Sequence, residues 1–264
     1  MKIAIVGTGN MGRALITGLL SSHPKQSIIA YDKSAAALKR LPKNIAVISP
    51  DRWTEAKNRP DVAIIAVKPQ DVADSLSRVQ DSANFKPLWI SIAAGVTLTE
   101  LRSLLGASAR ICRVMPNTPA LIGQGMSAYS LNDKCSGRDA KTVEAILSSC
   151  GRAIAVPEKL MNAVTGLSGS GPAYVYLFIE ALIEGGVTAG LPLAAARELA
   201  IQTVVGSALL AQQSPESPAE LKSRVMSPAG TTARGLMALE EGGFKYAVIK
   251  AVTSAAARAE ELGG

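Results

Sequence analysis

Histidine and cysteine are scarce in this 264-residue chain, and their scarcity excludes two kinds of catalytic site. His23 is the only histidine, and Cys112, Cys135 and Cys150 show no CxxC spacing. A structural zinc site needs about four Cys or His ligands, and a cysteine nucleophile needs a neighbouring base. We therefore expect no metal site, and we expect three unpaired thiols in a reducing compartment.

Aromatic residues make up only 4% of the chain, and the basic residues form no cluster. The formal net charge is +7, but Arg13, Lys33, Lys39, Arg52 and Lys68 are scattered. Single-stranded nucleic acid is bound by basic grooves with exposed aromatic side chains. We expect no nucleic-acid partner, because an anionic cofactor and substrate account for the charge equally well.

A long hydrophobic run is missing as well. The chain passes from Met1-Lys2 directly into a strand pattern, without the order of segments typical of a signal peptide. The most apolar later stretch, 173–189, contains Glu180 and Glu184 and falls short of a membrane span. The sequence therefore predicts a cytoplasmic protein with no membrane partner.

Short β-rich runs alternate with helical patterns through the first half of the chain. The runs are continuously apolar, which is typical of parallel strands covered by helices on both faces. They lie at 2–6, 27–31, 44–48, 61–67, 88–92 and 110–114, followed by a strand at 126–131, a helix at 136–149 and a strand at 153–156. We predict a doubly wound, mostly parallel α/β domain over residues 1–157.

Strand signals stop after Pro157, and residues 158–264 predict an all-helical domain. The expected helices lie at 158–165, 172–189, 193–212, 218–225, 228–241 and 244–262. The helix 193–212 is apolar on nearly every face and must be buried. A domain of this size has a small interior, so we expect a second copy of the chain to cover it.

A glycine-rich turn follows the first strand. Ile3–Val6 leads into Gly7-Thr8-Gly9-Asn10-Met11-Gly12 and then into a helical pattern. In a Rossmann-type fold such glycines permit a tight turn, close approach of a pyrophosphate, and close packing of helix on strand. The sequence therefore predicts a dinucleotide site at the start of this helix.

Residues at the ends of later strands extend the predicted dinucleotide site. Asp32 lies twenty residues beyond Gly12, where an acid can bind the adenosine ribose; an ordinary turn residue is an equal alternative. Lys33 and Ser34 follow and could instead hold a ribose 2′-phosphate, which leaves NAD and NADP both open. Lys68 follows a strand and is either a cofactor contact or a solvated lysine.

Several motifs together resemble the pyrroline-5-carboxylate reductase family. They occur in the family's order over essentially the whole chain: GTGNMG at 7–12, AVKP at 66–69, SIAAGVTL at 91–98, RVMPNTPA at 113–120, GLSGSGPAYVY at 166–176 and LKSRVMSPAGTTARGLMALEEGGF at 221–244.

The resemblance implies a Rossmann domain followed by a helical dimerisation domain, in a homodimer or a ring of dimers such as a decamer. It implies hydride transfer from NADPH or NADH to the C=N bond of 1-pyrroline-5-carboxylate, giving L-proline in the last step of proline biosynthesis. The implied cofactor-binding residues are Val6, Gly7, Thr8, Gly9, Asn10, Met11, Gly12, Asp32, Lys33, Ser34, Ala66, Val67, Lys68, Pro69, Ala93, Ala94 and Asn117.

The resemblance places the substrate at Glu158 and at Ser227-Pro228-Ala229-Gly230-Thr231-Thr232. We read Ser227 as an N-cap, Pro228 as the first helical residue, and Gly230 as leaving room for a ligand, although a merely capped helix has the same pattern. N–H groups at such a helix start bind a carboxylate. Matching implies that Ser227, Gly230 and Thr231 hold the carboxylate, while Thr232 is the catalytic hydroxyl at the ring nitrogen.

Two positions depart from the family pattern. Arg224 stands where relatives often carry a smaller polar residue, and Trp53 lies where some place a ribose-binding asparagine. Three other interpretations stay open: a β-hydroxyacid-dehydrogenase-type reductase, for which Lys222, Lys245 and Lys250 lack the family's motif; a dinucleotide sensor without turnover; and a basic nucleic-acid binder.

Overall fold

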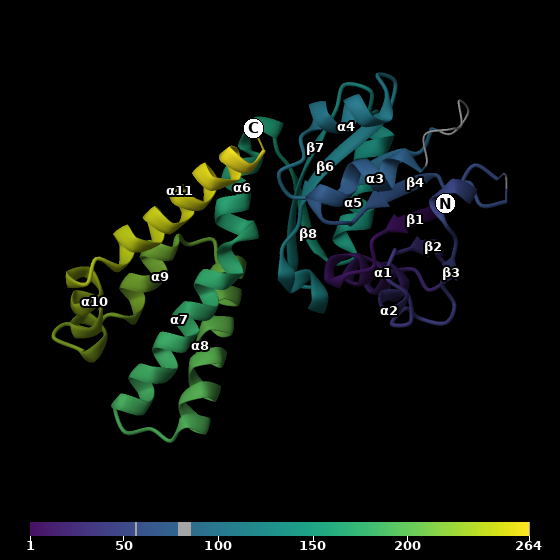
Figure 1. Cartoon of the computed structure of the whole chain (residues 1–264). Coiled ribbons are helices and arrows are strands. Elements are labelled where there is room, and N and C mark those ends of the chain that lie inside the picture. Colours follow the sequence, from purple (N-terminus) through teal and green to yellow (C-terminus); the bar gives the residue numbers. More distant parts are fainter. Residues whose placement is uncertain (56, 79–85, 264) are drawn as a thin grey trace. The chain divides into compact units, whose positions relative to one another are not determined.

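One mixed sheet organises the first part of the chain (Figure 1). The computed structural model describes residues 1–55, 57–78 and 86–263. Within these ranges eight strands pair in the order β3-β2-β1-β4-β5-β6-β7-β8. Their bounds are β1 Lys2–Val6, β2 Ser27–Tyr31, β3 Ala46–Val47, β4 Val62–Ile65, β5 Leu88–Ser91, β6 Arg110–Met115, β7 Gly125–Leu131 and β8 Gly151–Ala155.

Every neighbouring pair of strands is parallel except β6 and β7. The apolar runs form strands because both faces of the sheet are covered, and β4 and β5 are buried at every residue. The predicted doubly wound, mostly parallel sheet is confirmed. The predicted strand 44–48 is shorter, because only Ala46 and Val47 pair with β2.

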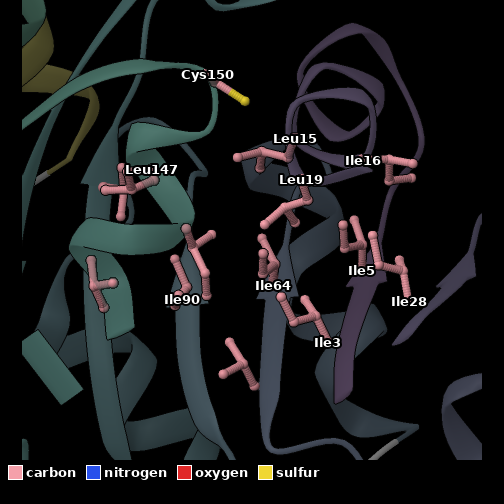
Figure 2. Packing of buried hydrophobic residues seen from close by; sticks show 14 of the residues in the cluster. Ile3, Ile5, Leu15, Ile16, Leu19, Ile28, Ile64, Ile90, Leu147 and Cys150 are labelled. Atoms are coloured by element: carbon pink, nitrogen blue, oxygen red, sulfur yellow. The ribbon is translucent and has the colours of Figure 1, made fainter. Parts of the chain in front are cut away.

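Helices cover the two faces of this sheet with separate cores. One core joins β1, β4 and β5 to α1 (Asn10–Ser22) and α5 (Gly137–Ser148), and Figure 2 shows Leu15 and Leu19 of α1 beside Ile64 of β4. The other face carries α3 (Val72–Ser77) and α4 (Leu98–Leu105). The short α2 (Ala35–Leu38) follows β2 and has no buried residue within the described ranges.

The segment predicted as one helix at 158–165 is not a single α-helix. The structure has a 3₁₀ turn at Glu158–Leu160, a short helix α6 at Met161–Val164, and a π-helical turn at Thr165–Gly169. Gly169 lies so close to Met115 that a Cβ there would displace the Cε methyl group at the end of the methionine side chain. The π-helical turn thus places Gly169 against the side chain of Met115 at the end of β6, and such turns are frequent at functional sites.

Residues 171–253 form a second compact unit, while residues 1–170 and 254–264 form the first. Its helices are α7 Gly171–Thr188, α8 Leu193–Gln213, α9 Pro218–Val225, α10 Thr231–Glu241 and most of α11 Phe244–Leu262. Tilted rings of Phe178 and Phe244, 5.7 Å apart, join α7 to α11. The domain boundary expected after residue 157 stays a prediction.

The helix α8 is long and apolar but hardly buried. Of its residues only Ala196 and Ala200 are buried in the described chain. Its mean hydropathy reaches 1.3 with 11% of that window buried, so length and composition alone would also suit a membrane span. A helix apolar on all sides needs some cover, from a partner or from lipid.

Candidate functional site

The turn between β1 and α1 forms an open cradle of backbone N–H groups. Gly7 has φ +92°, and a Cβ there would collide with the backbone of Ala66. Gly12 packs directly on the Gly7 carbonyl, so neither position admits a side chain.

Gly9 differs from these two glycines. A Cβ on Gly9 would meet no described atom within 4 Å, so packing within the chain does not require glycine there. Gly9 is the N-cap of α1 and, as a glycine, provides no side chain that could cap the first N–H groups of the helix. The free N–H groups and the space above Gly9 fit the pyrophosphate of a dinucleotide, because a helix N-terminus favours negative charge.

A cavity of about 430 Å³ opens beside this turn at the carboxyl ends of β1, β2 and β4. In a doubly wound sheet this edge, where the strand order reverses between β1 and β4, is where ligands bind. The cavity is lined by these predicted cofactor residues: Val6, Gly7, Gly9, Asp32, Lys33, Ala66, Val67 and Lys68.

The carboxylate of Asp32 already has protein partners. Its Oδ2 accepts hydrogen bonds from the N–H of Thr8 at 2.6 Å and from the Thr8 hydroxyl at 3.1 Å, and Oδ1 accepts from the N–H of Ser34 at 2.8 Å. Ser34 also caps α2. Asp32 thus ties the glycine turn to the loop after β2, and a sugar hydroxyl would have to share its oxygens.

Lys33 forms an ion pair with Asp71 across the cavity, with 2.7 Å between Nζ and Oδ1. The hydrogen bond and the charge of Asp71 raise the pKa of Lys33, so this amine stays protonated. Arg78 approaches the Tyr31 hydroxyl at 3.5 Å and Asp74 at 3.6 Å. Lys33 and Arg78 at the cavity therefore each lie beside a carboxylate that an anionic ligand could displace.

Residues of α3 and of the turn before it also line the cavity, although no sequence motif had predicted them. Asp71, Asp74, Ser75 and Arg78 lie there. Counted from Asp71, the other three lie three, four and seven residues further on, which places all four on one helix face shortly after the end of β4. This polar spacing was the signal that could have identified them.

The remaining predicted cofactor residues do not line this cavity. Asn10 is exposed and accepts a hydrogen bond from Arg13, Met11 packs on the core, and Pro69 begins a 3₁₀ turn. Ala93 is buried and Ala94 exposed in the loop between β5 and α4.

Asn117 joins two segments rather than facing the cavity. Its Oδ1 accepts from the N–H of Met126 in β7 at 2.8 Å, and its Nδ2 donates to the carbonyl of Ser168 at 3.3 Å. This side chain therefore holds the π turn against the sheet, and its predicted cofactor contact stays untested.

The predicted substrate residue Glu158 lies at the end of the sheet unit. Its Oε1 accepts from the N–H of Leu98 at 2.6 Å and from Nη1 of Arg113 at 3.2 Å. The side chain of Arg113 is 8% exposed and that of Glu158 is 32% exposed. No motif predicted this arrangement, because the partners lie 45 and 60 residues from Glu158.

The predicted carboxylate loop has a different start from the one expected. The N-cap of α10 is Gly230 rather than Ser227, and Thr231 is the first helical residue. Ala229 has φ +56°, which interrupts a helix that would begin at Pro228. Ser227 instead folds back beneath Gly230, where its hydroxyl occupies the space of a Cβ.

The corrected start of α10 still presents backbone donors. In the described chain its N-cap makes no side-chain hydrogen bond, which leaves the N–H groups of Thr231 and Thr232 without a capping side chain. Uncapped N–H groups at a helix start can bind a carboxylate.

The two departures from the family pattern have structural explanations. Trp53 is fully buried on the α3 face, and its Nε1 donates to the carbonyl of Ile48 at 3.1 Å. It is therefore a core residue. Arg224 is exposed and pairs with Glu216 at 2.6 Å, which ties the end of α9 to the loop before it.

The three cysteines are free, and two of them, Cys112 and Cys150, are buried. Burial raises the pKa of all three thiols, which disfavours thiolate chemistry. Over residues 1–55, 57–78 and 86–263, no group of three His, Cys, Asp or Glu side chains is placed to hold a metal ion.

Two family models match the chain. Residues 158–262 match the model described as pyrroline-5-carboxylate reductase dimerisation, and residues 2–95 match NADP oxidoreductase coenzyme F420-dependent. The first covers the helices with exposed apolar faces, and the second covers the glycine turn and the cavity.

Curated relatives match over the full length. The pyrroline-5-carboxylate reductase of Synechocystis is 44% identical over 100% of this chain and 98% of its own, and that of Escherichia coli is 39% identical over 99% and 98%. Among solved structures, the Plasmodium falciparum pyrroline carboxylate reductase with NADP bound has a TM-score of 0.88 and 34% identity, covering 100% of this chain and 98% of that one. The Coxiella burnetii enzyme has a TM-score of 0.92 and 33% identity, covering 99% and 98%. On its sequence, its fold and its glycine turn, this chain belongs to the pyrroline-5-carboxylate reductase family.

Proposed function

We propose that this chain transfers a hydride from NADPH to the C=N carbon of 1-pyrroline-5-carboxylate and so produces L-proline, with NADH as a possible second donor. One observation carries the proposal. Reductases of this name match the chain over its whole length, and the chain has a glycine at position 9 that its own packing does not require. This glycine leaves the start of α1 open for a dinucleotide.

The sheet unit holds the dinucleotide. The uncapped start of α1 binds the pyrophosphate through backbone N–H groups, and Lys33, Lys68 and Arg78 face the adenosine end. These cations suit a ribose 2′-phosphate, because Asp32 already accepts hydrogen bonds from Thr8 and Ser34. The bound nicotinamide supplies the hydride; the chain supplies position and charge.

The helical unit holds the imine carboxylate. The N–H groups at Gly230 and Thr231 bind the carboxylate, with Ser227 beside them. The Thr232 hydroxyl contacts the ring nitrogen and keeps its proton in place while the ring carbon is reduced. A weak acid suffices because the protonated iminium needs only a hydrogen-bonding partner.

The assembly is a homodimer or a ring of dimers in the cytoplasm. The match to a dimerisation model over 158–262 and the exposed apolar surface of α8 support a partner copy rather than lipid as its cover. Three free cysteines agree with a reducing compartment.

The first experiment follows NADPH and NADH absorbance after purified protein is mixed with 1-pyrroline-5-carboxylate. Rapid oxidation establishes the reaction and its preferred donor. Dinucleotide binding without oxidation would instead favour a sensor or a dehydrogenase of another type.

Thr232→Ala tests the proposed proton contact. We expect a kcat lower by about 10- to 100-fold with an NADPH Kd within about twofold of the parent, because the hydroxyl touches only the substrate. Thr188→Ala is the matched control, since that hydroxyl donates to the backbone carbonyl of Glu184 within α7. Normal turnover, or equal loss of turnover and NADPH affinity, would contradict the role of Thr232.

A further inference from the structure

A buried charge lies on the α4 side of the sheet, outside the dinucleotide cavity. Arg113 is in β6, and its side chain is 8% exposed. Ile111, two residues before it, packs with Leu98 and Leu101 in the core on that face. A guanidinium in such a place needs a fixed counter-charge, because an unpaired buried ion is strongly disfavoured. Among the described ion pairs, Glu158 supplies it.

The same carboxylate oxygen also holds the first turn of α4. Oε1 of Glu158 accepts the N–H of Leu98, the first helical residue, at 2.6 Å. That N–H has no partner within its own helix, since the first turn of a helix leaves its donors free. One oxygen therefore joins β6, the start of α4 and the 3₁₀ turn that leaves the sheet, all within one compact unit.

The start of α4 determines where the loop before it lies. Residues 92–97 connect the end of β5 to α4, with Ala93 buried and Gly95 at φ +81°. The loop is anchored at β5 by pairing and at α4 by the bond from Leu98 to Glu158. A shift of that helix start would move Ala93 and Ala94, which the proposed function places against the cofactor.

We propose that Glu158 and Arg113 are a pair of positioning residues that hold the β5–α4 loop at the nicotinamide for hydride transfer. Glu158 acts through Leu98, not by touching the substrate. The role at the nicotinamide rests on the proposed function, whereas the link from Arg113 through Glu158 to Leu98 rests on the described contacts.

The kinetic test compares Glu158→Gln, Arg113→Gln and the double variant, using NADPH and 4-deuterated NADPH. We expect each single variant to lower kcat by about tenfold and to raise the deuterium isotope effect on kcat, because hydride transfer becomes slower. The NADPH Kd should change less than about threefold, since the glycine turn is untouched. The double variant should be no slower than the slower single variant, because both changes break one link.

Arg102→Gln is the matched control on the same helix. Arg102 lies in the last turn of α4 and pairs with the exposed Asp133, with 3.6 Å between Nη1 and Oδ1. Its loss should leave kcat, the isotope effect and the exchange rate of the Leu98 amide at parental values. If Arg113→Gln fails to fold, Arg113→Lys keeps the charge, loses the planar fork, and should show the same isotope effect to a smaller extent.

Hydrogen exchange provides a readout that is independent of turnover. Arg113→Gln deletes no atom of α4, yet it should speed exchange of the Leu98 amide by freeing Glu158. Parental exchange at Leu98, or a parental kcat and isotope effect in folded Glu158 and Arg113 variants, overturns the proposal. So does a raised KM for the imine in Glu158→Gln alone, which would make Glu158 a direct contact. If the parental protein oxidises no NADPH with the imine, the proposed function is refuted. The exchange rate of the Leu98 amide then tests by itself whether Arg113 and Glu158 hold the start of α4.

Discussion

The helices α1 and α8 show how differently the two compact units use apolar residues. In α1 the apolar residues fall on one face, and Leu15, Ile16 and Leu19 are buried against the sheet. In α8 apolar residues surround the helix, and Leu209 and Leu210 remain 47% and 58% exposed. The sheet unit completes its core within one chain, whereas the helical unit needs a second chain.

The largest effect is expected from a charge placed on the exposed face of α8. Leu209→Glu should abolish self-association, lowering affinity by at least about 100-fold, because a carboxylate would be buried without a partner. Light scattering after size exclusion gives the mass. Gln212→Glu, near the polar end of the helix, is the control. An unchanged mass for Leu209→Glu would mean that α8 is not an interface.

A core truncation compares the two units directly. Ile90 is fully buried in β5, so Ile90→Ala should cost about 3 kcal/mol of unfolding free energy in urea. Ile249 of α11 is 55% exposed, so Ile249→Ala should cost under about 1 kcal/mol in a background made monomeric by Leu209→Glu. Equal costs in that background would show that both units have self-sufficient cores.

Asp139 in the sheet unit should make stability depend on pH. Burial alone raises the pKa of this carboxyl, but hydrogen bonds from Ser136 and the charge of Arg110, 2.6 Å away, lower it overall. Because the folded pKa lies below the unfolded value, the stabilisation is present above about pH 4 and is lost as the pH falls through the folded pKa.

We therefore expect Asp139→Asn to cost about 1–2 kcal/mol at pH 7 and progressively less in acid, measured by urea unfolding across that range. Asp133→Asn is the control, since Asp133 is an exposed partner of Lys134 and its loss should leave the unfolding midpoint unchanged. A difference for Asp139→Asn that stays constant down to pH 3 would contradict the assignment.

The smallest effect is expected at Ala229 in the helical unit. Its φ of +56° is unfavourable for a residue with a Cβ, and glycine would relieve this strain at some cost in chain entropy. Ala229→Gly should change the unfolding free energy by less than about 1 kcal/mol. The kcat of this variant then shows whether a more flexible loop still holds the imine. If the free energy of unfolding fell by more than about 2 kcal/mol, the Ala229 methyl group would be shown to pack in the folded state.

Local patterns predicted most of the fold. The strand patterns located the eight strands of the described residues, and the glycine spacing located the turn at α1, because these signals arise between residues close in the chain. Three local predictions were inaccurate, the first being the strand expected at 44–48, of which only Ala46 and Val47 pair with β2. The helix expected at 228–241 begins at Thr231, and the helix expected at 158–165 is divided into three turns. The proline and the helical periodicity near residue 228 do not indicate that Ala229 has a positive φ. The periodicity at 158–165 does not indicate that the chain just beyond it, at Gly169, packs against Met115.

The sequence by itself determined the alternation of strands and helices, the dinucleotide turn, and an apolar helix in need of cover. The tertiary structure alone decided how polar side chains are used: Asp32 binds Thr8 and Ser34, α3 lines the cavity with one polar face, and Glu158 joins Arg113 to Leu98. The physical reason is distance along the chain. Period and turn chemistry are local, whereas the partner of a buried charge depends on which strands the topology places side by side.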